Sequence, residues 1–227
     1  MSKKQFLIYS LLFLFSFSAC VYICSDLSVF MSAIFRNQQR VGAILPSSVF
    51  LARSITKNIV AKDQPIKVLE IGAGTGVFTE QVLEKLRKED IFDVIEIDVS
   101  LCEVLREKCK DYKNVHVHCI SVLDWDPPYK YDFIISGLPF NSFGSDFVFS
   151  VLDRYTKIIK KNGILSYFEY LWAYPIKKFF LKGTDKIDYM KSKCLLSDFR
   201  RKFEFDRDFI FPNIPPAYTY HLRIEKE

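Results

Sequence analysis

The sequence VLEIGAGTG at residues 68–76 joins a short apolar run to three glycines at alternate positions, Gly72, Gly74 and Gly76. Glycine at such positions lets the backbone turn tightly and lets a ligand approach without meeting a Cβ atom. A dinucleotide-binding G-x-G-x-x-G fingerprint needs a further glycine at position 77, where this chain has Val77. The stretch therefore predicts a strand that turns into a helix at a ligand-binding loop, and it disfavours a pyrophosphate ligand.

Strand-like and helical patterns alternate along the rest of the chain. The strand-like runs are KVLEIG, FDVIEID, NVHVHCI, YDFIISG and ILSYFEY, and the helical runs between them are TEQVLEKLRKE, SLCEVLREKCK and SDFVFSVLDRYTKIIKKNG. This alternation predicts an α/β fold with a doubly wound, mostly parallel, Rossmann-like sheet.

Several residues are predicted to mark the ends of helices. Ser100 and Glu103 stand in capping-box register, Ser145 can cap the third helical run, and Gly163 follows its end. Ahead of the first strand, Ser47 or Ser48 can cap a further helix.

Composition limits the class of protein. The chain has 227 residues, of which 49% are hydrophobic and 26% charged, so it suits one domain with a short appendage and excludes a disordered chain or a multi-span transporter. The net charge of +5 favours anionic partners, either lipid headgroups or RNA. Six cysteines without a CxxC pair and three scattered histidines predict reduced thiols and no metal site.

The N-terminus carries an apolar run. Residues 6–24, FLIYSLLFLFSFSACVYIC, hold no charge over 19 positions, enough at about 1.5 Å per residue to cross a hydrocarbon core of ~30 Å. We expect a transmembrane anchor, with a cleaved signal peptide ending near Cys20 or an internal core helix as alternatives. Positive residues on both flanks leave the orientation open.

The glycine stretch, preceded by Glu70, resembles motif I of the class I S-adenosylmethionine (SAM) methyltransferases. Glu96 comes 20 residues after Gly76, at the end of the second strand. A carboxylate there can accept hydrogen bonds from both ribose hydroxyls of SAM. In such folds an acidic residue after the third strand often accepts a hydrogen bond from the adenine amine. Ser121 stands at this place and departs from that pattern. Asp124 is the alternative residue for this contact. The cofactor-binding positions that we predict are Glu70, Gly72, Ala73, Gly74, Thr75, Gly76, Glu96, Ile97, Ser121, Val122, Ser136 and Gly137.

A second motif, SGLPFNSF, follows the fourth strand. It resembles the Asn-Leu-Pro-Tyr motif of the adenine dimethylases that act on ribosomal RNA, whose Asn accepts the adenine amine, but Gly137 replaces that Asn. Together with FRNQQRVGAILPSS (35–48), VLEIGAGTGVFTE and NIPPAYTYHLR (213–223), the motif resembles the bacterial phosphatidylethanolamine N-methyltransferase-like family over most of residues 30–227.

This resemblance implies a SAM-dependent N-methyltransferase with a membrane phospholipid as both substrate and surface. We expect a membrane anchor over 1–26, N-terminal helices over 27–60 and a methyltransferase domain over 61–227, which faces the cytoplasm because SAM is made there. The alternatives are an RNA adenine methyltransferase and a membrane-tethered SAM-binding protein without transfer activity.

The expected chemistry needs an aromatic wall. An ethanolamine amine must lose a proton before it attacks the methyl group, and its methylated ammonium products can be held by cation–π attraction. Phe140 and Tyr170 are the predicted catalytic residues, and Trp172 and Tyr174 follow the fifth strand with Tyr170, at the sheet edge where Phe140 is also expected. The alternative is that these rings only pack in the core. Residues 175–207 are basic with interleaved aromatics, which suits an anionic membrane, RNA or a solvated helix.

Overall fold

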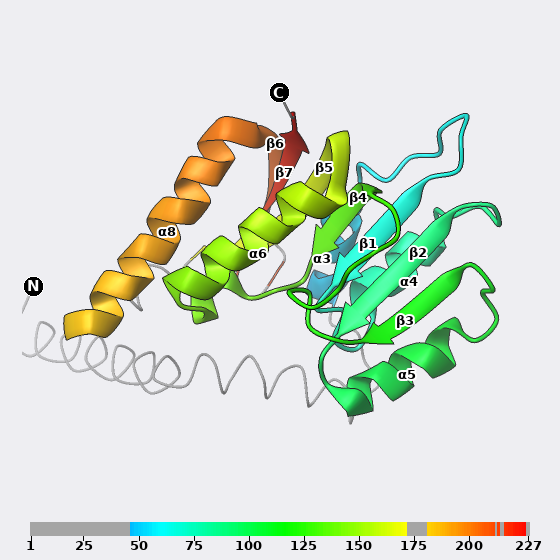
Figure 1. Ribbon diagram of the computed structural model, residues 1–227, viewed down its shortest axis with the longest axis horizontal. Coiled ribbons are helices and arrows are strands. Elements are labelled where there is room, and N and C mark those ends of the chain that lie inside the picture. Colours follow the sequence, from blue (N-terminus) through cyan, green and yellow to red (C-terminus); the bar gives the residue numbers. More distant parts are fainter. Residues whose placement is uncertain (1–45, 172–180, 212, 214–215, 226–227) are drawn as a thin grey trace, which may run out of the picture. The chain divides into compact units, whose positions relative to one another are not determined.

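A seven-stranded sheet organises the computed structural model, which describes residues 46–171, 181–211, 213 and 216–225 (Figure 1). The strands lie in the order β3-β2-β1-β4-β5-β7-β6. They are β1 (Lys67–Ile71), β2 (Ile91–Glu96), β3 (Val115–Cys119), β4 (Tyr131–Ser136), β5 (Ile159–Tyr170), β6 (Glu204–Ile210) and β7 (Ala217–Ile224).

The first five strands are parallel, and β7 pairs antiparallel with both β5 and β6. This confirms the prediction of a doubly wound, mostly parallel sheet. The chain order reverses between β1 and β4, and in open α/β sheets ligands bind outside the carboxyl ends of the strands at such a switch point.

Helices cover both faces of the sheet. They are α3 (Pro46–Ile55), α4 (Val77–Leu83), α5 (Val99–Cys109), α6 (Ser145–Ile158) and α8 (Gly183–Phe203), with a 3₁₀ turn η1 (Phe140–Ser142) after β4. One core cluster joins α6 and α8 to side chains such as Leu69, Ile134 and Leu165. The other joins α3, α4 and α5 to the alternate side chains, such as Val68 and Phe133. Figure 1 shows α6 and α8 in front of the sheet and α3 and α4 behind it.

The predicted cap of α5 is wrong. The helix begins at Val99, and its N-cap is Asp98, whose side chain accepts from the backbone N–H groups of Ser100 and Leu101. Ser100 is already inside the first turn, so it is not the cap, and the register of Ser100 and Glu103 as a capping box does not apply. An Asp cap satisfies the same orphan donors as a serine would, which makes the two choices hard to separate from sequence.

The ends of two other helices also differ from the prediction. α3 begins at Pro46, ahead of both Ser47 and Ser48. α6 has Gly144 at its N-cap position, and the N–H and Oγ of Ser145 instead bond to Asp188 on α8.

The third helical run ends earlier than predicted. α6 stops at Ile158, and β5 starts at once at Ile159, so Gly163 lies inside a strand. Lys160, which follows shortly after α6 in the sequence, pairs with Asp132 on β4 over 2.7 Å.

Within the described parts of the chain, no helix has the length and apolar character needed to cross a bilayer. The predicted anchor over residues 1–26, and most of the predicted helices over 27–60, lie outside the described residues.

Candidate cofactor and acceptor site

The glycine loop leaves β1 toward the end of β2. Gly72, Gly74 and Gly76 have φ values of +69°, +58° and +84°, in the left-handed region that favours glycine. The N–H of Gly72 donates to the carbonyl of Ile95 over 2.8 Å, which pins the loop to β2. A Cβ atom at Gly72 would lie 2.9 Å from a methyl group of Leu138. The loop therefore has the tight geometry that the three glycines predicted.

Glu96 is placed beside this loop at the end of β2. Its Oε2 accepts from the Gly74 N–H over 2.8 Å, and its Oε1 accepts from the N–H groups of Ile97 and Asp98 over 2.8 and 3.0 Å. The residue is 8% exposed. Three backbone donors thus hold the carboxylate in one position at the loop, while the Ile97 side chain points to solvent.

Glu70 lies beneath the loop. Its side chain is fully buried, its Oε2 accepts from Thr79 Oγ1 on α4 over 2.7 Å, and its Oε1 has no hydrogen-bond partner. Burial raises the pKa of Glu70 to about 8, against the opposing effects of Thr79 and of the positive charge of Lys108. Lys108 Nζ in turn donates to the carbonyl of Thr75 over 2.9 Å. Lys108 therefore holds the glycine loop, while Glu70 joins β1 to α4.

The turn after β3 holds Ser121 and Asp124, the two residues predicted to contact the adenine. The carbonyl of Ser121 accepts from the backbone N–H groups of Asp124 and Trp125, and its Oγ accepts from Leu123 N–H over 3.2 Å. Val122 is buried and Asp124 is exposed. The turn lies next to Glu96, because the N–H of Ile120 donates to the carbonyl of Glu96 over 3.0 Å. Both Ser121 and Asp124 stay predictions for the adenine contact.

A network that the sequence analysis missed anchors this turn. Asp93 in the middle of β2 lies 2.7 Å from His118 Nε2 and accepts from the hydroxyls of Tyr129 and Tyr131, each over 2.8 Å. Trp125 stacks on His118 with ring centroids 4.0 Å apart and donates its indole N–H to Tyr131. The Asp93 pKa is lowered by these partners, chiefly His118, although burial raises it. The available signal in the sequence was Asp93 inside the otherwise apolar part of β2, together with the alternating histidines of β3.

The end of β4 packs directly on the glycine loop. The N–H of Gly137 donates to the carbonyl of Ile71 over 2.8 Å, and a Cβ atom on Gly137 would lie 2.4 Å from the carbonyl oxygen of Gly72. No side chain fits at position 137 without moving one of the two backbones. Ser136 is buried, and its Oγ lies 2.8 Å from the hydroxyl of Tyr155.

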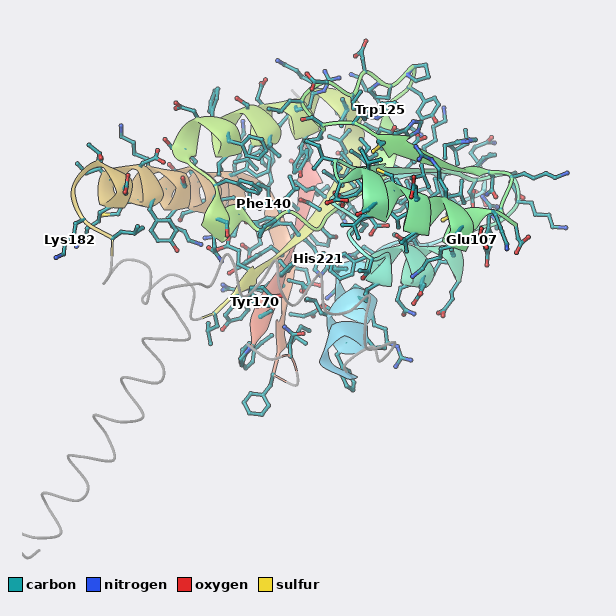
Figure 2. The ribbon with its side chains drawn as sticks, turned by 90° about the horizontal axis from the view of Figure 1, so that it is seen from below. Glu107, Trp125, Phe140, Tyr170, Lys182 and His221 are labelled. Atoms are coloured by element: carbon teal, nitrogen blue, oxygen red, sulfur yellow. The ribbon has the colours of Figure 1, made fainter. Side chains whose placement is uncertain are left out.

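The two predicted catalytic rings lie apart (Figure 2). Phe140 is 1% exposed and packs edge-to-face on Tyr155 and Tyr167, in the core cluster under α6 and α8. Tyr170 ends β5 and packs against the cluster of the opposite face, where its ring contacts Phe168 and burial raises its pKa to about 12. The structure does not bring the two rings together, and their catalytic roles stay predictions. Trp172 and Tyr174 lie outside the described residues.

The residues at the switch point fit SAM. Bound SAM would need an acceptor for its ribose hydroxyls, which the fixed carboxylate of Glu96 could supply, and a Cβ-free path for its tail, which Gly72, Gly74 and Gly76 could offer. Among the described residues, no cluster of His, Cys, Asp or Glu could hold a metal ion.

Comparisons with known proteins point to methyltransferases. The family model described as ribosomal RNA adenine dimethylase matches residues 44–165. The chain is 25% identical over 209 residues to an ornithine lipid N-methyltransferase of Singulisphaera acidiphila, covering 89% of this chain and 98% of that protein. It is 39% identical over 93 residues to the ribosomal RNA small subunit methyltransferase A of Syntrophotalea carbinolica, covering 39% of this chain and 33% of that protein.

Solved structures share the fold. The N-methyltransferase NodS from Bradyrhizobium japonicum WM9 matches with a TM-score of 0.58 at 14% identity, over 85% of this chain and 97% of that one. NodS in complex with S-adenosyl-L-homocysteine matches with a TM-score of 0.57 at 14% identity, over 79% of this chain and 86% of that one. At these identities the likeness concerns the fold.

Proposed function

Because this chain belongs to the ribosomal RNA adenine dimethylase family and is a class I SAM-dependent N-methyltransferase, we propose that its acceptor is the amine of a phospholipid headgroup, such as phosphatidylethanolamine. The proposed acceptor differs from the ribosomal RNA adenine that the family's description names. It depends on the end of β4.

Gly137 is the observation that carries the proposal. The Asn that the adenine dimethylase motif has at this place would put its Cβ 2.4 Å from the carbonyl oxygen of Gly72, closer than real Cβ contacts come. The chain therefore offers no side-chain amide here to accept an adenine amine. A lipid amine does not need that acceptor, since it is a stronger nucleophile than an adenine amine once it has lost its proton.

The range of the sequence matches supports the same acceptor class. The lipid N-methyltransferase of Singulisphaera acidiphila is matched over 98% of its length, whereas the ribosomal RNA methyltransferase of Syntrophotalea carbinolica is matched over 33%.

The residues of the switch point divide the work of transfer. When bound, the cofactor supplies a methyl group on a positively charged sulfur, which an amine lone pair takes with release of S-adenosylhomocysteine and the amine's proton. Glu96 holds the ribose hydroxyls, and the backbone of residues 72–76 holds the tail. Gly137 and Leu138 close the loop from the side of β4. Holding the methyl donor in a fixed position beside the acceptor lowers the entropic cost of bringing the two reacting groups together.

RNA is the second candidate acceptor. The family model over residues 44–165 and the 39% identity to a ribosomal RNA methyltransferase favour it, and the net charge of +5 suits it.

We further propose that the protein is held at a membrane with its catalytic domain facing the cytoplasm. The uncharged run at residues 6–24 and the cytosolic origin of SAM support this placement.

One assay separates the acceptors. The full-length chain is incubated with methyl-labelled SAM and either phosphatidylethanolamine vesicles, ornithine lipid vesicles or undermethylated small ribosomal subunits. Label in the lipid fraction and none in RNA is expected. Label in RNA alone would establish the second candidate, and SAM binding without label in any acceptor would identify a binding protein that lacks transfer activity.

A further inference from the structure

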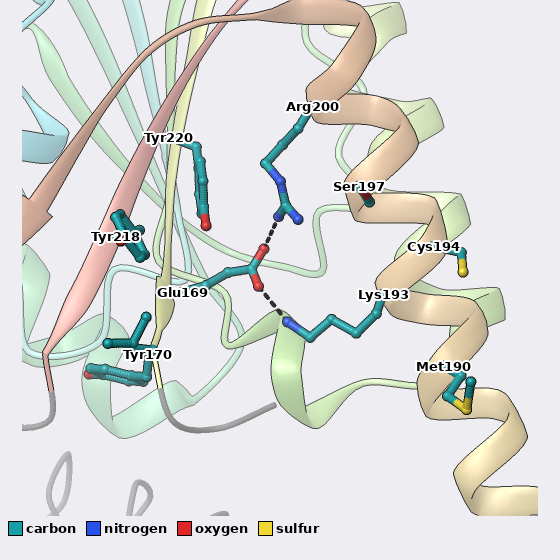
Figure 3. Close-up of a pocket in the computed structure, with 10 residues that line it drawn as sticks. Glu169, Tyr170, Met190, Lys193, Cys194, Ser197, Arg200, Tyr218 and Tyr220 are labelled. Carbon is teal, nitrogen blue, oxygen red and sulfur yellow. Dashed lines mark hydrogen bonds and ion pairs between the residues drawn. The ribbon is translucent and has the colours of Figure 1, made fainter. Parts of the chain in front are cut away.

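A pocket of about 400 Å³ lies between α8 and the strand ends of β5 and β7 (Figure 3). It is lined by Glu169, Tyr170, Leu171, Met190, Lys193, Cys194, Ser197, Arg200, Tyr218 and Tyr220. Tyr170 is the final residue of β5, so the pocket opens at the same carboxyl edge of the sheet as the glycine loop. Nothing in the function derived so far uses it.

A triad of charges forms one wall of the pocket. Glu169 makes ion pairs with Lys193 through Oε2 and with Arg200 through Oε1. Figure 3 shows the carboxylate between the two cations, which both come from α8. The side chains are only 9%, 14% and 19% exposed for Glu169, Lys193 and Arg200, so water screens them weakly.

The residues that line the pocket carry a net positive charge. Among the described lining residues, two cations face one carboxylate. A partly buried excess of positive charge favours an anionic group. The guanidinium of Arg200 also donates to the hydroxyl of Tyr167 over 3.1 Å and stacks over the ring of Tyr220 at 4.6 Å. Arg200 is thereby fixed in place, which leaves Lys193 as the more adaptable of the two cations.

Two aromatic rings lie on the strand side of the pocket, next to Glu169. Tyr218 and Tyr220 stand on β7 with ring centroids 6.0 Å apart, on the strand side of Figure 3. Electron-rich rings beside a carboxylate are a favourable surrounding for an ammonium group.

An aromatic row connects the pocket to the end of β4. The rings of Tyr220 and Tyr167 lie 5.3 Å apart, and those of Tyr167 and Phe140 lie 5.4 Å apart. Phe140 follows Gly137 by three residues, so the row runs from the pocket to the strand end beside the glycine loop.

We propose that this pocket binds a zwitterionic amine headgroup, with its anion on Lys193 and Arg200 and its ammonium on Glu169 and the tyrosine rings. The proposal rests on the proposed function and names the chemistry of its acceptor: an amine and an anion a few bonds apart. A zwitterion exchanges partners with the existing ion pairs without adding net charge to a weakly screened site. The anion is a phosphate in phosphatidylethanolamine and a carboxylate in an ornithine lipid.

Binding is tested by calorimetry on the full-length chain, so that the result does not depend on transfer. The ligands are dihexanoyl phosphatidylethanolamine, a short-chain ornithine lipid and dihexanoyl phosphatidic acid, which has the anion and no amine. We expect Lys193→Gln to weaken all three by about tenfold or more, as for loss of a charge-assisted hydrogen bond. Lys191→Gln, an exposed change of the same charge on α8, should leave them unchanged. A larger loss for one zwitterion than for the other identifies the natural anion.

Glu169→Gln tests the ammonium side. It should weaken the two zwitterions and leave phosphatidic acid bound at least as tightly, a split that loss of structure would not produce. The SAM dissociation constant and the unfolding temperature are measured for each variant. If Glu169→Gln does not fold, the contrast of Lys193→Gln with Lys191→Gln decides.

The outcomes separate the two proposals. Ligand binding that depends on Lys193, without lipid methylation, keeps the pocket and overturns the proposed function. Lipid methylation with unchanged binding and KM in Lys193→Gln overturns the pocket.

Discussion

Glu96 shows how a single carboxylate is prepared for a ligand. Three backbone N–H groups from the glycine loop and the start of α5 fix it, so the side chain does not have to be ordered when the cofactor binds. Pre-ordering of this kind lowers the entropic cost of binding.

Substitution of Glu96 is therefore expected to weaken cofactor binding. Glu96→Ala removes charge-assisted hydrogen bonds, each worth ~1.5–3 kcal/mol, and calorimetry should show a loss of SAM affinity on that scale. Glu103→Ala, exposed on α5, is the matched control. An unchanged dissociation constant in a folded Glu96→Ala variant would disprove the assignment.

Glu70 predicts a pH dependence of stability. Burial raises its pKa from 4.5 to about 8 in the folded protein, so between these values the folded state keeps a proton that the unfolded state has released. Stability contributed by this group is full below pH 4.5, falls as the pH rises toward 8 and then stays level. The Glu70→Gln variant lacks this dependence of stability on pH, because the glutamine side chain does not ionise.

The difference in unfolding temperature between Glu70→Gln and wild type should therefore grow in favour of the variant from about pH 5 to about pH 8. Scanning calorimetry at several pH values measures it, with Glu103→Gln as the exposed control. A difference that stays constant with pH would show that Glu70 ionises normally.

At the scale of elements, the N-cap of α5 is Asp98, which follows Glu96 by two residues. Asp98 satisfies the N–H groups of Ser100 and Leu101 and so fixes the start of the helix at Val99, close to the Glu96 carboxylate. The helix start and the site are thus one local structure.

Asp98→Ala should lower the unfolding free energy by about 1 kcal/mol, the usual cost of a lost side-chain cap. Denaturant titration measures it, and Asp98→Ser should restore most of the loss because serine is also a good cap. If Ser100→Ala proves as costly as Asp98→Ala, the capping role belongs to Ser100 after all.

At the scale of the whole described structure, the first helix is joined to the last strands. Ser54 on α3 bonds to both Asp208 on β6 and Thr219 on β7, and Lys57 pairs with Asp208 over 2.7 Å. These contacts tie the segment before the glycine loop to the C-terminal hairpin. The antiparallel strands β6 and β7 therefore belong to the same folding unit as the cofactor half.

The membrane placement predicts a protease pattern. If the catalytic domain faces the cytoplasm, proteases added to intact cells should leave it whole, and proteases added to inverted membrane vesicles should cut it. The domain should also sediment with membranes through residues 6–24. Cleavage of the domain in intact cells, or a mature chain that begins at Cys20, would contradict the placement.

Local signals in the sequence determined much of this protein. The alternation of strand and helix patterns, the glycines that only a left-handed turn requires and the spacing from Gly76 to Glu96 together predicted the fold and the carboxylate beside the loop. These features depend on neighbouring residues or on one strand–helix unit, so periodicity and spacing record them.

Only the tertiary structure decided which distant side chains meet. Glu169 pairs with Lys193 and Arg200, 24 and 31 positions away, because α8 packs on β7, the neighbour of β5, and Gly137 packs on Gly72 because β4 lies beside β1. Periodicity says which face of a strand is buried but not which element covers it. That choice comes from the order of strands in the sheet, which sums many weak contacts between segments far apart in the chain.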